Sequence, residues 1–233
     1  VCGSPAKVEW FPWSAATQGA YSMTFLSIHE QVLAEWCSFP DRSTGVGQLI
    51  DSYLAGAQNS EDDVIHLLFA ANRLEKRQEL IVKLQGGTTL VCDRYAYSGA
   101  AFTLAKGSPG LDLAWCKSVE HGLLPAPDVV FFLKAPADVA AGRGGFGNER
   151  YEVLEFQKKV ADWYMRLSKT EGWTELDATK SIDAVHEEIL KATAQAVDAC
   201  KSGRPLGLLW QEGEVQSLKS SRNEAEIGGK EDK

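Results

Sequence analysis

Residues 88–102 constrain the fold of this chain more than any other stretch. They begin with a short run of Thr, Leu, Val and Cys after Gly86 and Gly87, the pattern of a strand buried on both faces of a parallel sheet. Asp93 and Arg94 come directly after this run. Because ligands of open α/β sheets bind beyond the carboxyl ends of the strands, this charged pair is placed to hold a phosphate and its metal. The alternative is a structural ion pair at a strand end.

Along the rest of the chain, short apolar runs typical of buried strands alternate with segments whose apolar residues have helical spacing. Strands are predicted over residues 34–39, 129–133 and 173–176, and helices over 45–55, 64–84, 111–117, 156–167 and 181–200. The helix over 64–84 is expected to bury an apolar stripe made of Val64, Leu67, Leu68, Ala71 and Leu74. No clear period is found before about residue 24. The alternation predicts one α/β domain with a doubly wound, mostly parallel sheet between two helix layers.

Composition and charge exclude several classes of function. The formal net charge of -8 argues against a nucleic-acid-binding surface, and no apolar run is long enough to span a membrane. The five cysteines form no CxxC pair, which favours reduced thiols in a cytoplasmic compartment, nuclear or mitochondrial pools included. The four histidines lack metal-ligand spacing and are interpreted as surface or local polar residues.

Arginines recur at the positions where a phosphate would be expected. Arg42, Arg73 and Arg94 fall at predicted strand ends or loops, and Arg143 and Arg150 bound a glycine-rich stretch typical of a mobile flap. Converging guanidinium groups suit a phosphoryl group, because they grip its oxygens in pairs and offset its charge. A single arginine of this kind is usually a solvated surface residue and not a phosphate ligand.

Three aromatic residues are near these arginines in the sequence. Phe69, Phe102 and Tyr151 could stack on a nucleobase, whereas a place in the core is the usual role of any one of them.

Seven stretches, taken together and in order, resemble eukaryotic-type thymidylate kinases over about residues 34–210. They are FPDRSTGVGQLIDSYL, HLLFAANRLEK, TTLVCDRYAYSGAAFTLAKG, LPAPDVVFFL, GRGGFGNERYE, DATKSIDAVHEEI and RPLGLLW. The resemblance implies a P-loop NTPase-like three-layer fold with a lid over about residues 141–152. It also implies transfer of the terminal phosphoryl group of MgATP to dTMP, giving dTDP, and a homodimer that binds neither nucleic acid nor membrane.

The resemblance also assigns roles to individual residues. Arg42 and Arg94 are expected on the dTMP phosphate, Phe69 on the thymine face and Arg73 on its polar edge. The full set expected around dTMP is Phe39, Arg42, Phe69, Arg73, Arg94, Ser98, Gly99, Phe102, Tyr151 and Gln157. Asp93, Arg94, Arg143 and Arg150 are expected to serve catalysis, with Asp93 near Mg²⁺ and the other two arginines in the lid over ATP.

One expected element is missing from the sequence. A P-loop reads GxxxxGK[ST], and residues 1–33 contain no such string; the one Gly-Lys dipeptide lies in the polar stretch 211–233, which is expected to be disordered. Residues 1–33 are therefore interpreted as an atypical segment in which the first strand of the sheet is replaced.

Three interpretations follow from this replacement. The first is a thymidylate kinase whose N-terminal segment is altered or mis-joined, and the second is a dTMP-binding protein without turnover. The third, a kinase for another nucleotide, is disfavoured by the FAANR and DRYAYSG strings.

Overall fold

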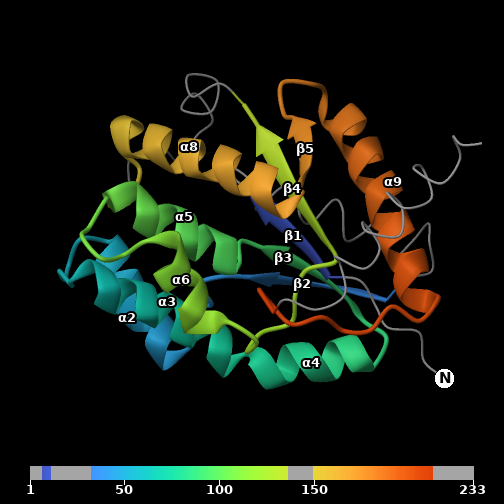
Figure 1. Ribbon diagram of the computed structural model, residues 1–233, viewed down its shortest axis with the longest axis horizontal. Helices are drawn as coiled ribbons and strands as arrows, with labels where there is room; N and C mark the ends of the chain where they lie inside the picture. Colours follow the sequence, from blue (N-terminus) through green and yellow to red (C-terminus); the bar gives the residue numbers. More distant parts are fainter. Residues whose placement is uncertain (1–6, 12–32, 136–148, 212–233) are drawn as a thin grey trace, which may run out of the picture.

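A parallel five-stranded sheet organises the computed structural model, which describes residues 7–11, 33–135 and 149–211 (Figure 1). The strands are β1 (Lys7–Phe11), β2 (Ala34–Ser38), β3 (Thr89–Asp93), β4 (Val129–Lys134) and β5 (Thr174–Asp177), in the spatial order β2-β3-β1-β4-β5. All neighbouring strands pair in parallel. The predicted α/β class with a doubly wound parallel sheet is confirmed.

Helices connect the strands and cover both faces of the sheet. They are α2 (Gly45–Leu54), α3 (Asp62–Glu75), α4 (Arg77–Gln85), α5 (Ala96–Lys106), α6 (Leu113–Glu120), α8 (Leu154–Glu171) and α9 (Ile182–Lys201). Parallel pairing requires such crossovers, because the chain must return to the same end of the sheet before each new strand.

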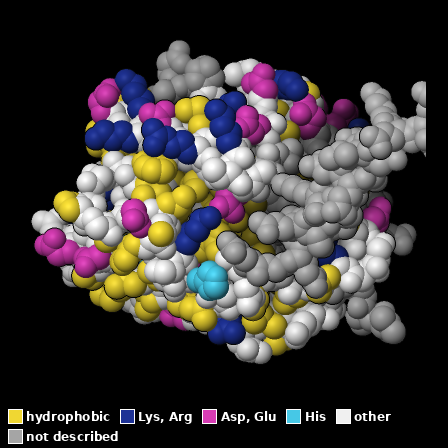
Figure 2. Space-filling model, viewed as in Figure 1, with side chains coloured by type: hydrophobic (Ala, Val, Ile, Leu, Met, Phe, Trp, Pro, Cys, Tyr) yellow, Lys and Arg dark blue, Asp and Glu magenta, His cyan; other side chains and the backbone are white. Residues whose placement is uncertain are grey.

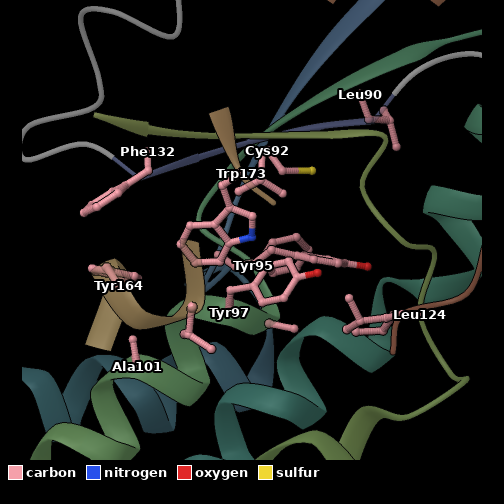
Figure 3. Packing of buried hydrophobic residues seen from close by; sticks show 14 of the residues in the cluster. Leu90, Cys92, Tyr95, Tyr97, Ala101, Leu124, Phe132, Tyr164 and Trp173 are labelled. Carbon is pink, nitrogen blue, oxygen red and sulfur yellow. The ribbon is translucent and has the colours of Figure 1, made fainter. Parts of the chain in front are cut away.

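Side chains that alternate along β3 and β4 build a separate core on each face of the sheet. Leu90, Cys92 and Phe132 pack with residues of α4, α5 and α8 (Figure 3), whereas Val91 and Phe131 pack with residues of α9. Since successive side chains of a strand point to opposite faces, strands buried on both faces read as continuous apolar runs. This explains why β3 and β4 were the easiest elements to predict.

Strand β1 corrects the prediction for the N-terminal segment. The sequence showed no strand period there, yet Lys7–Phe11 forms the central strand, with Val8 opposite Val91 of β3 and opposite Val129 of β4. The prediction of a missing central strand is wrong. A strand of five residues is too short for a reliable period, and here its position is defined by backbone pairing on both sides.

Helix α3 corrects the prediction for residues 64–84. The structure divides this segment at Lys76 into α3 and α4, and it buries His66, Asn72 and Arg73 rather than the predicted apolar stripe. Val64 and Leu67 of that stripe are 45% and 48% exposed. The buried face of this helix is therefore mixed, with Ile65 and Ala70 beside the three polar residues.

Two predictions fall largely outside the described residues. Most of the predicted lid over 141–152, with Arg143, lies there, as does the predicted tail from residue 212 onward. Within the described ranges, none of the helices is long and apolar enough to cross a membrane.

Candidate active site

A pocket lies beyond the carboxyl ends of β2 and β3, where the sheet topology places ligands. The two strand ends are held together by the Phe39 amide, which donates to the Asp93 carbonyl oxygen at 3.0 Å. The cavity measures about 320 Å³, within the range of small-molecule sites. Its lining includes every residue predicted around dTMP: Phe39, Arg42, Phe69, Arg73, Arg94, Ser98, Gly99, Phe102, Tyr151 and Gln157.

Asp93 and Arg94 line this pocket at the carboxyl end of β3. Asp93 Oδ1 is buried and has no hydrogen-bond partner among the described residues. Burial raises the pKa of Asp93 to about 6, while the neighbouring Arg94 opposes the shift. Arg94 has a left-handed backbone with φ of 63°, and its guanidinium carbon lies 5.4 Å from the Phe102 ring centre. Backbone strain of this kind is concentrated at functional sites.

Arg42 reaches the same end of the pocket from the loop after β2. Its two terminal nitrogens donate to Asp51 Oδ1 and Glu149 Oε1, both at 2.5 Å. The Arg42 side chain is 47% exposed, so these ion pairs are weak in water and an anion can replace them. Arg94 makes no ion pair with any carboxylate in the described part of the chain. Both guanidinium groups are thus available to a phosphate.

Asn72 of α3 holds the loop that carries Phe39 and Arg42. Its Oδ1 accepts from the Asp41 amide at 2.7 Å, and its Nδ2 donates to the Asp41 carbonyl oxygen at 3.1 Å. Nδ2 also donates to Thr44 Oγ1 at 2.9 Å, and the Asn72 side chain is fully buried. A buried amide with its polar atoms satisfied fixes backbone well, so Asn72 positions the loop.

The other end of the pocket has the character of a base site. Phe69 lines it, Phe102 lies between it and Arg94, and Arg73 is buried with its guanidinium group against Gly99. A Cβ at Gly99 would lie 2.9 Å from Arg73 Nη2, so a glycine is required for this approach. Ser98 Oγ accepts from the Tyr164 hydroxyl of α8 at 3.1 Å, which ties this end to the core.

Tyr151 forms a side wall of the pocket. Its ring stacks on Phe156 at 5.3 Å between centres, and its carbonyl oxygen accepts from Gln157 Nε2 at 2.7 Å. Lys106 Nζ lies 5.3 Å from the centre of the Tyr151 ring and pairs with Asp62 at 2.8 Å. Burial raises the pKa of the Tyr151 hydroxyl, which therefore stays protonated at neutral pH.

The two predicted lid arginines are not brought into this pocket. Arg150 points away from it: Nε donates to the Tyr53 carbonyl oxygen at 2.9 Å and Nη2 to the Gln58 carbonyl oxygen at 2.8 Å. It holds the connection between α2 and α3 in this structure. Arg143 lies outside the described residues. Their catalytic roles remain predictions.

Sequence reasoning missed several residues that line or support the pocket, four of which matter for the site. His66 and Lys106 line it, Asn72 positions its loop, and Glu120 pairs with Arg73. The signal for His66 and Asn72 was a polar residue in mid-helix outside the apolar stripe, which is costly unless satisfied. Glu120 gave no signal, because it is 47 residues from its partner.

The parallel sheet and its match to a solved kinase structure give the molecule the P-loop NTPase fold, in the class of the nucleoside monophosphate kinases. The family model for thymidylate kinase matches residues 22–189. The chain belongs to the thymidylate kinase family.

Similarities to individual members extend over most of the chain. The Arabidopsis thaliana thymidylate kinase is 47% identical over 195 residues, 84% of this chain and 72% of that protein. The Homo sapiens thymidylate kinase is 47% identical over 180 residues, 76% of this chain and 83% of that protein. The solved structure of Candida albicans thymidylate kinase superposes with a TM-score of 0.75 at 27% identity, covering 88% of this chain and 99% of that chain.

Proposed function

We propose that this chain binds dTMP in the pocket beyond β2 and β3 and transfers the terminal phosphoryl group of ATP to it, giving dTDP. Its family consists of dTMP kinases. The observation that carries the proposal is that all ten residues predicted around dTMP line one cavity. They come from four separate segments of the chain, so their convergence was not dictated by their spacing in the sequence.

The distribution of charge supports one orientation of the ligand. The free guanidinium of Arg94 and the exposed guanidinium of Arg42 favour the phosphate at the strand ends. The aromatic rings of Phe69 and Phe102 favour a base beside this phosphate position, with Phe102 next to Arg94. Phosphoryl transfer needs positioning and charge stabilisation more than covalent help, so these residues suffice on the acceptor side.

Asp93 fits a magnesium ion. Its buried Oδ1 lacks a partner among the described residues, and a cation would satisfy this oxygen and favour the ionised carboxylate. The described residues hold no cluster of three or more His, Cys, Asp or Glu side chains suited to a metal. Mg²⁺ commonly takes one or two carboxylates together with water and substrate phosphates, so a single aspartate is compatible with it. When bound, the ion would neutralise charge on the phosphates.

A specific observation favours a second candidate, a dTMP-binding protein without turnover. The sequence contains no GxxxxGK[ST] string, whose backbone amides and lysine normally cradle the phosphates of ATP. Loss of a single donor of this kind commonly costs about 3 kcal/mol of transition-state stabilisation. The acceptor pocket does not depend on that loop.

Calorimetric titration with dTMP, followed by a coupled turnover assay with ATP and Mg²⁺, separates the candidates. Binding of dTMP with production of dTDP is the expected result. Binding without turnover would support the second candidate. No binding of dTMP would overturn both.

We also propose that the chain forms a homodimer through α3. The stripe with Val64 and Leu67 has helical spacing, yet both side chains are about half exposed. Exposed Leu49 lies on the neighbouring α2, and Figure 2 shows hydrophobic side chains reaching the surface over α2, α3 and α6. An apolar stripe of this kind commonly marks a protein interface.

For localisation, we propose the cytoplasm. No disulfide bond joins the four cysteines within the described ranges, Cys37, Cys92, Cys116 and Cys200, which is typical of a reducing compartment.

A further inference from the structure

We propose that Glu120 is a positioning residue for base selection: its carboxylate fixes which edge of the Arg73 guanidinium faces the ligand. This inference rests on the proposed function, because it concerns the base end of the dTMP pocket. Glu120 ends α6, whereas Arg73 belongs to α3, so the pair also joins two helices across the back of the site.

The contact between the two side chains is bidentate and buried. Arg73 Nε donates to Glu120 Oε1 at 2.7 Å, and Arg73 Nη2 donates to Glu120 Oε2 at 2.8 Å. Arg73 is 2% exposed and Glu120 is fully buried. Two parallel hydrogen bonds of this kind fix the plane of a guanidinium group as well as its position.

This pairing limits which donors of Arg73 remain for the pocket. Glu120 uses Nε and one hydrogen of Nη2, which leaves both hydrogens of Nη1 and one of Nη2. Gly99 approaches the same group so closely that a Cβ there would lie 2.9 Å from Nη2 and 3.5 Å from Nη1. Nη1 is the one nitrogen that makes no bond to Glu120, in a residue that lines the cavity. A guanidinium group has donors only, so it selects a base that presents an acceptor.

The pairing also cancels charge at the base end. Glu120 neutralises Arg73, while Arg94 stays free of carboxylate partners in the described part of the chain. Next to the pair, burial lowers the pKa of His66 to about 4, so this residue is neutral at pH 7 and adds no charge. An anionic phosphate is therefore attracted to Arg94, whereas the neutralised Arg73 suits an uncharged hydrogen-bond acceptor of the base.

Thymine and 5-methylcytosine test this selection because they differ in the edge that they present. Thymine carries the O4 acceptor, whereas cytosine carries an N4 amino donor at the same position. The experiment is calorimetric titration of the full chain with dTMP and with 5-methyl-dCMP, for the wild type and for Glu120→Gln. Glutamine keeps the size of the side chain but can accept only one of the two hydrogen bonds.

In Glu120→Gln, we expect the Kd for dTMP to rise about tenfold and the preference for dTMP over 5-methyl-dCMP to fall by a similar factor. The control is Glu171→Gln, which removes an ion pair with Lys117 outside the pocket and should leave the preference unchanged. If Glu120→Gln does not fold, Glu120→Asp keeps the charge but shortens the side chain, and it should also reduce the preference.

An unchanged preference in a folded Glu120 variant would overturn this assignment while leaving the proposed function intact. A wild-type chain that binds no dTMP would overturn both. A loss of thermal stability with a normal preference would show that Glu120 supports the fold only, and it would also overturn the assignment.

Discussion

Asp93 and Arg94 are adjacent in the chain but differ in what surrounds them. The Asp93 carboxylate is buried with an unpartnered oxygen, and burial dominates the shift in its pKa. The Arg94 guanidinium lies beside an aromatic ring and, among the described residues, has no acidic ion-pair partner. In the proposed function, a metal would satisfy the Asp93 oxygen and a phosphate would pair with the Arg94 guanidinium.

Removing the Arg94 side chain tests the acceptor assignment. In Arg94→Ala, we expect the affinity for dTMP to fall by at least about 100-fold, because a desolvated charged contact to the phosphate is lost. The measurement is calorimetric titration, with circular dichroism to check that helix content is unchanged. Arg204→Ala is the control, since Arg204 is half-exposed and makes only a long contact of 3.8 Å with Asp128. Wild-type affinity in Arg94→Ala would contradict the assignment.

Replacing Asp93 should stabilise the empty protein in a pH-dependent way. The pKa of Asp93 is about 6 in the folded state, above the ordinary 3.8, so the folded chain binds more protons between these values. The contribution of this group to stability therefore falls as pH rises from about 4 to 6, by about 3 kcal/mol at most.

Without nucleotide or Mg²⁺, we expect Asp93→Asn to be more stable than the wild type at pH 7.5 and equally stable at pH 4. Thermal unfolding at both pH values measures this difference. Parallel stability curves for the two proteins would show that the Asp93 carboxyl titrates as an exposed aspartate does.

At the scale of single elements, helix α2 depends on one close approach. Gly47 packs against the loop after β2, where a Cβ would clash with the Asp41 carbonyl oxygen and lie 2.8 Å from Arg42 Cα. Gly45, in the same first turn, has no atom within 4 Å of an added Cβ. The loop that carries Phe39 and Arg42 is therefore shaped by Gly47.

These two glycines give a matched pair of substitutions. Gly47→Ala should cost about 2 to 3 kcal/mol of stability and weaken dTMP binding, because the loop must move. Gly45→Ala should be neutral or stabilise the protein by up to about 1 kcal/mol. Denaturant unfolding and dTMP titration measure both effects. Equal stabilities for the two variants would mean that the loop is free to shift.

Helix α3 shows where prediction from the sequence succeeds and where it fails. The period of Val64, Leu67 and Leu68 predicted a helix correctly, but Val64 and Leu67 are about half exposed and only Leu68 of these three packs against the core. Periodicity reports that a helix has an apolar side and does not report what covers that side. The polar residues His66, Asn72 and Arg73 are buried because other segments supply their partners.

The same distinction holds across the whole molecule. The α/β class could be predicted, because the alternation of strands and helices is a local property of the sequence, whereas the convergence of Arg42, Phe69 and Arg94 on one pocket was expected from the family resemblance. The orientation of Arg150 could not, since its partners are backbone carbonyl oxygens more than 90 residues away. Strand β1 could not be predicted for a related reason, because its position depends on backbone pairing with β3 and β4.

The proposed homodimer is tested by placing a charge on the exposed stripe. Leu67→Lys should weaken dimerisation by at least about 100-fold, because an interface centre tolerates an unpaired charge poorly, while monomer stability changes by about 0.5 kcal/mol or less. Sedimentation analysis measures the change in assembly. Val82→Lys on α4 is the control, since Val82 is also an exposed apolar residue but lies off this stripe. A monomeric wild type, or a dimeric Leu67→Lys, would contradict the proposed interface.

Helix α3 directs one side to the pocket and the opposite, apolar side outward. If that outer side holds a second copy of the chain, assembly and ligand binding share one rigid element. The free energies of dimerisation and of dTMP binding are then linked. If dimerisation raises the affinity for dTMP by some factor, thermodynamic reciprocity requires that dTMP raises the affinity between the two copies by the same factor. The affinity measured for dTMP would then depend on the concentration of the protein itself.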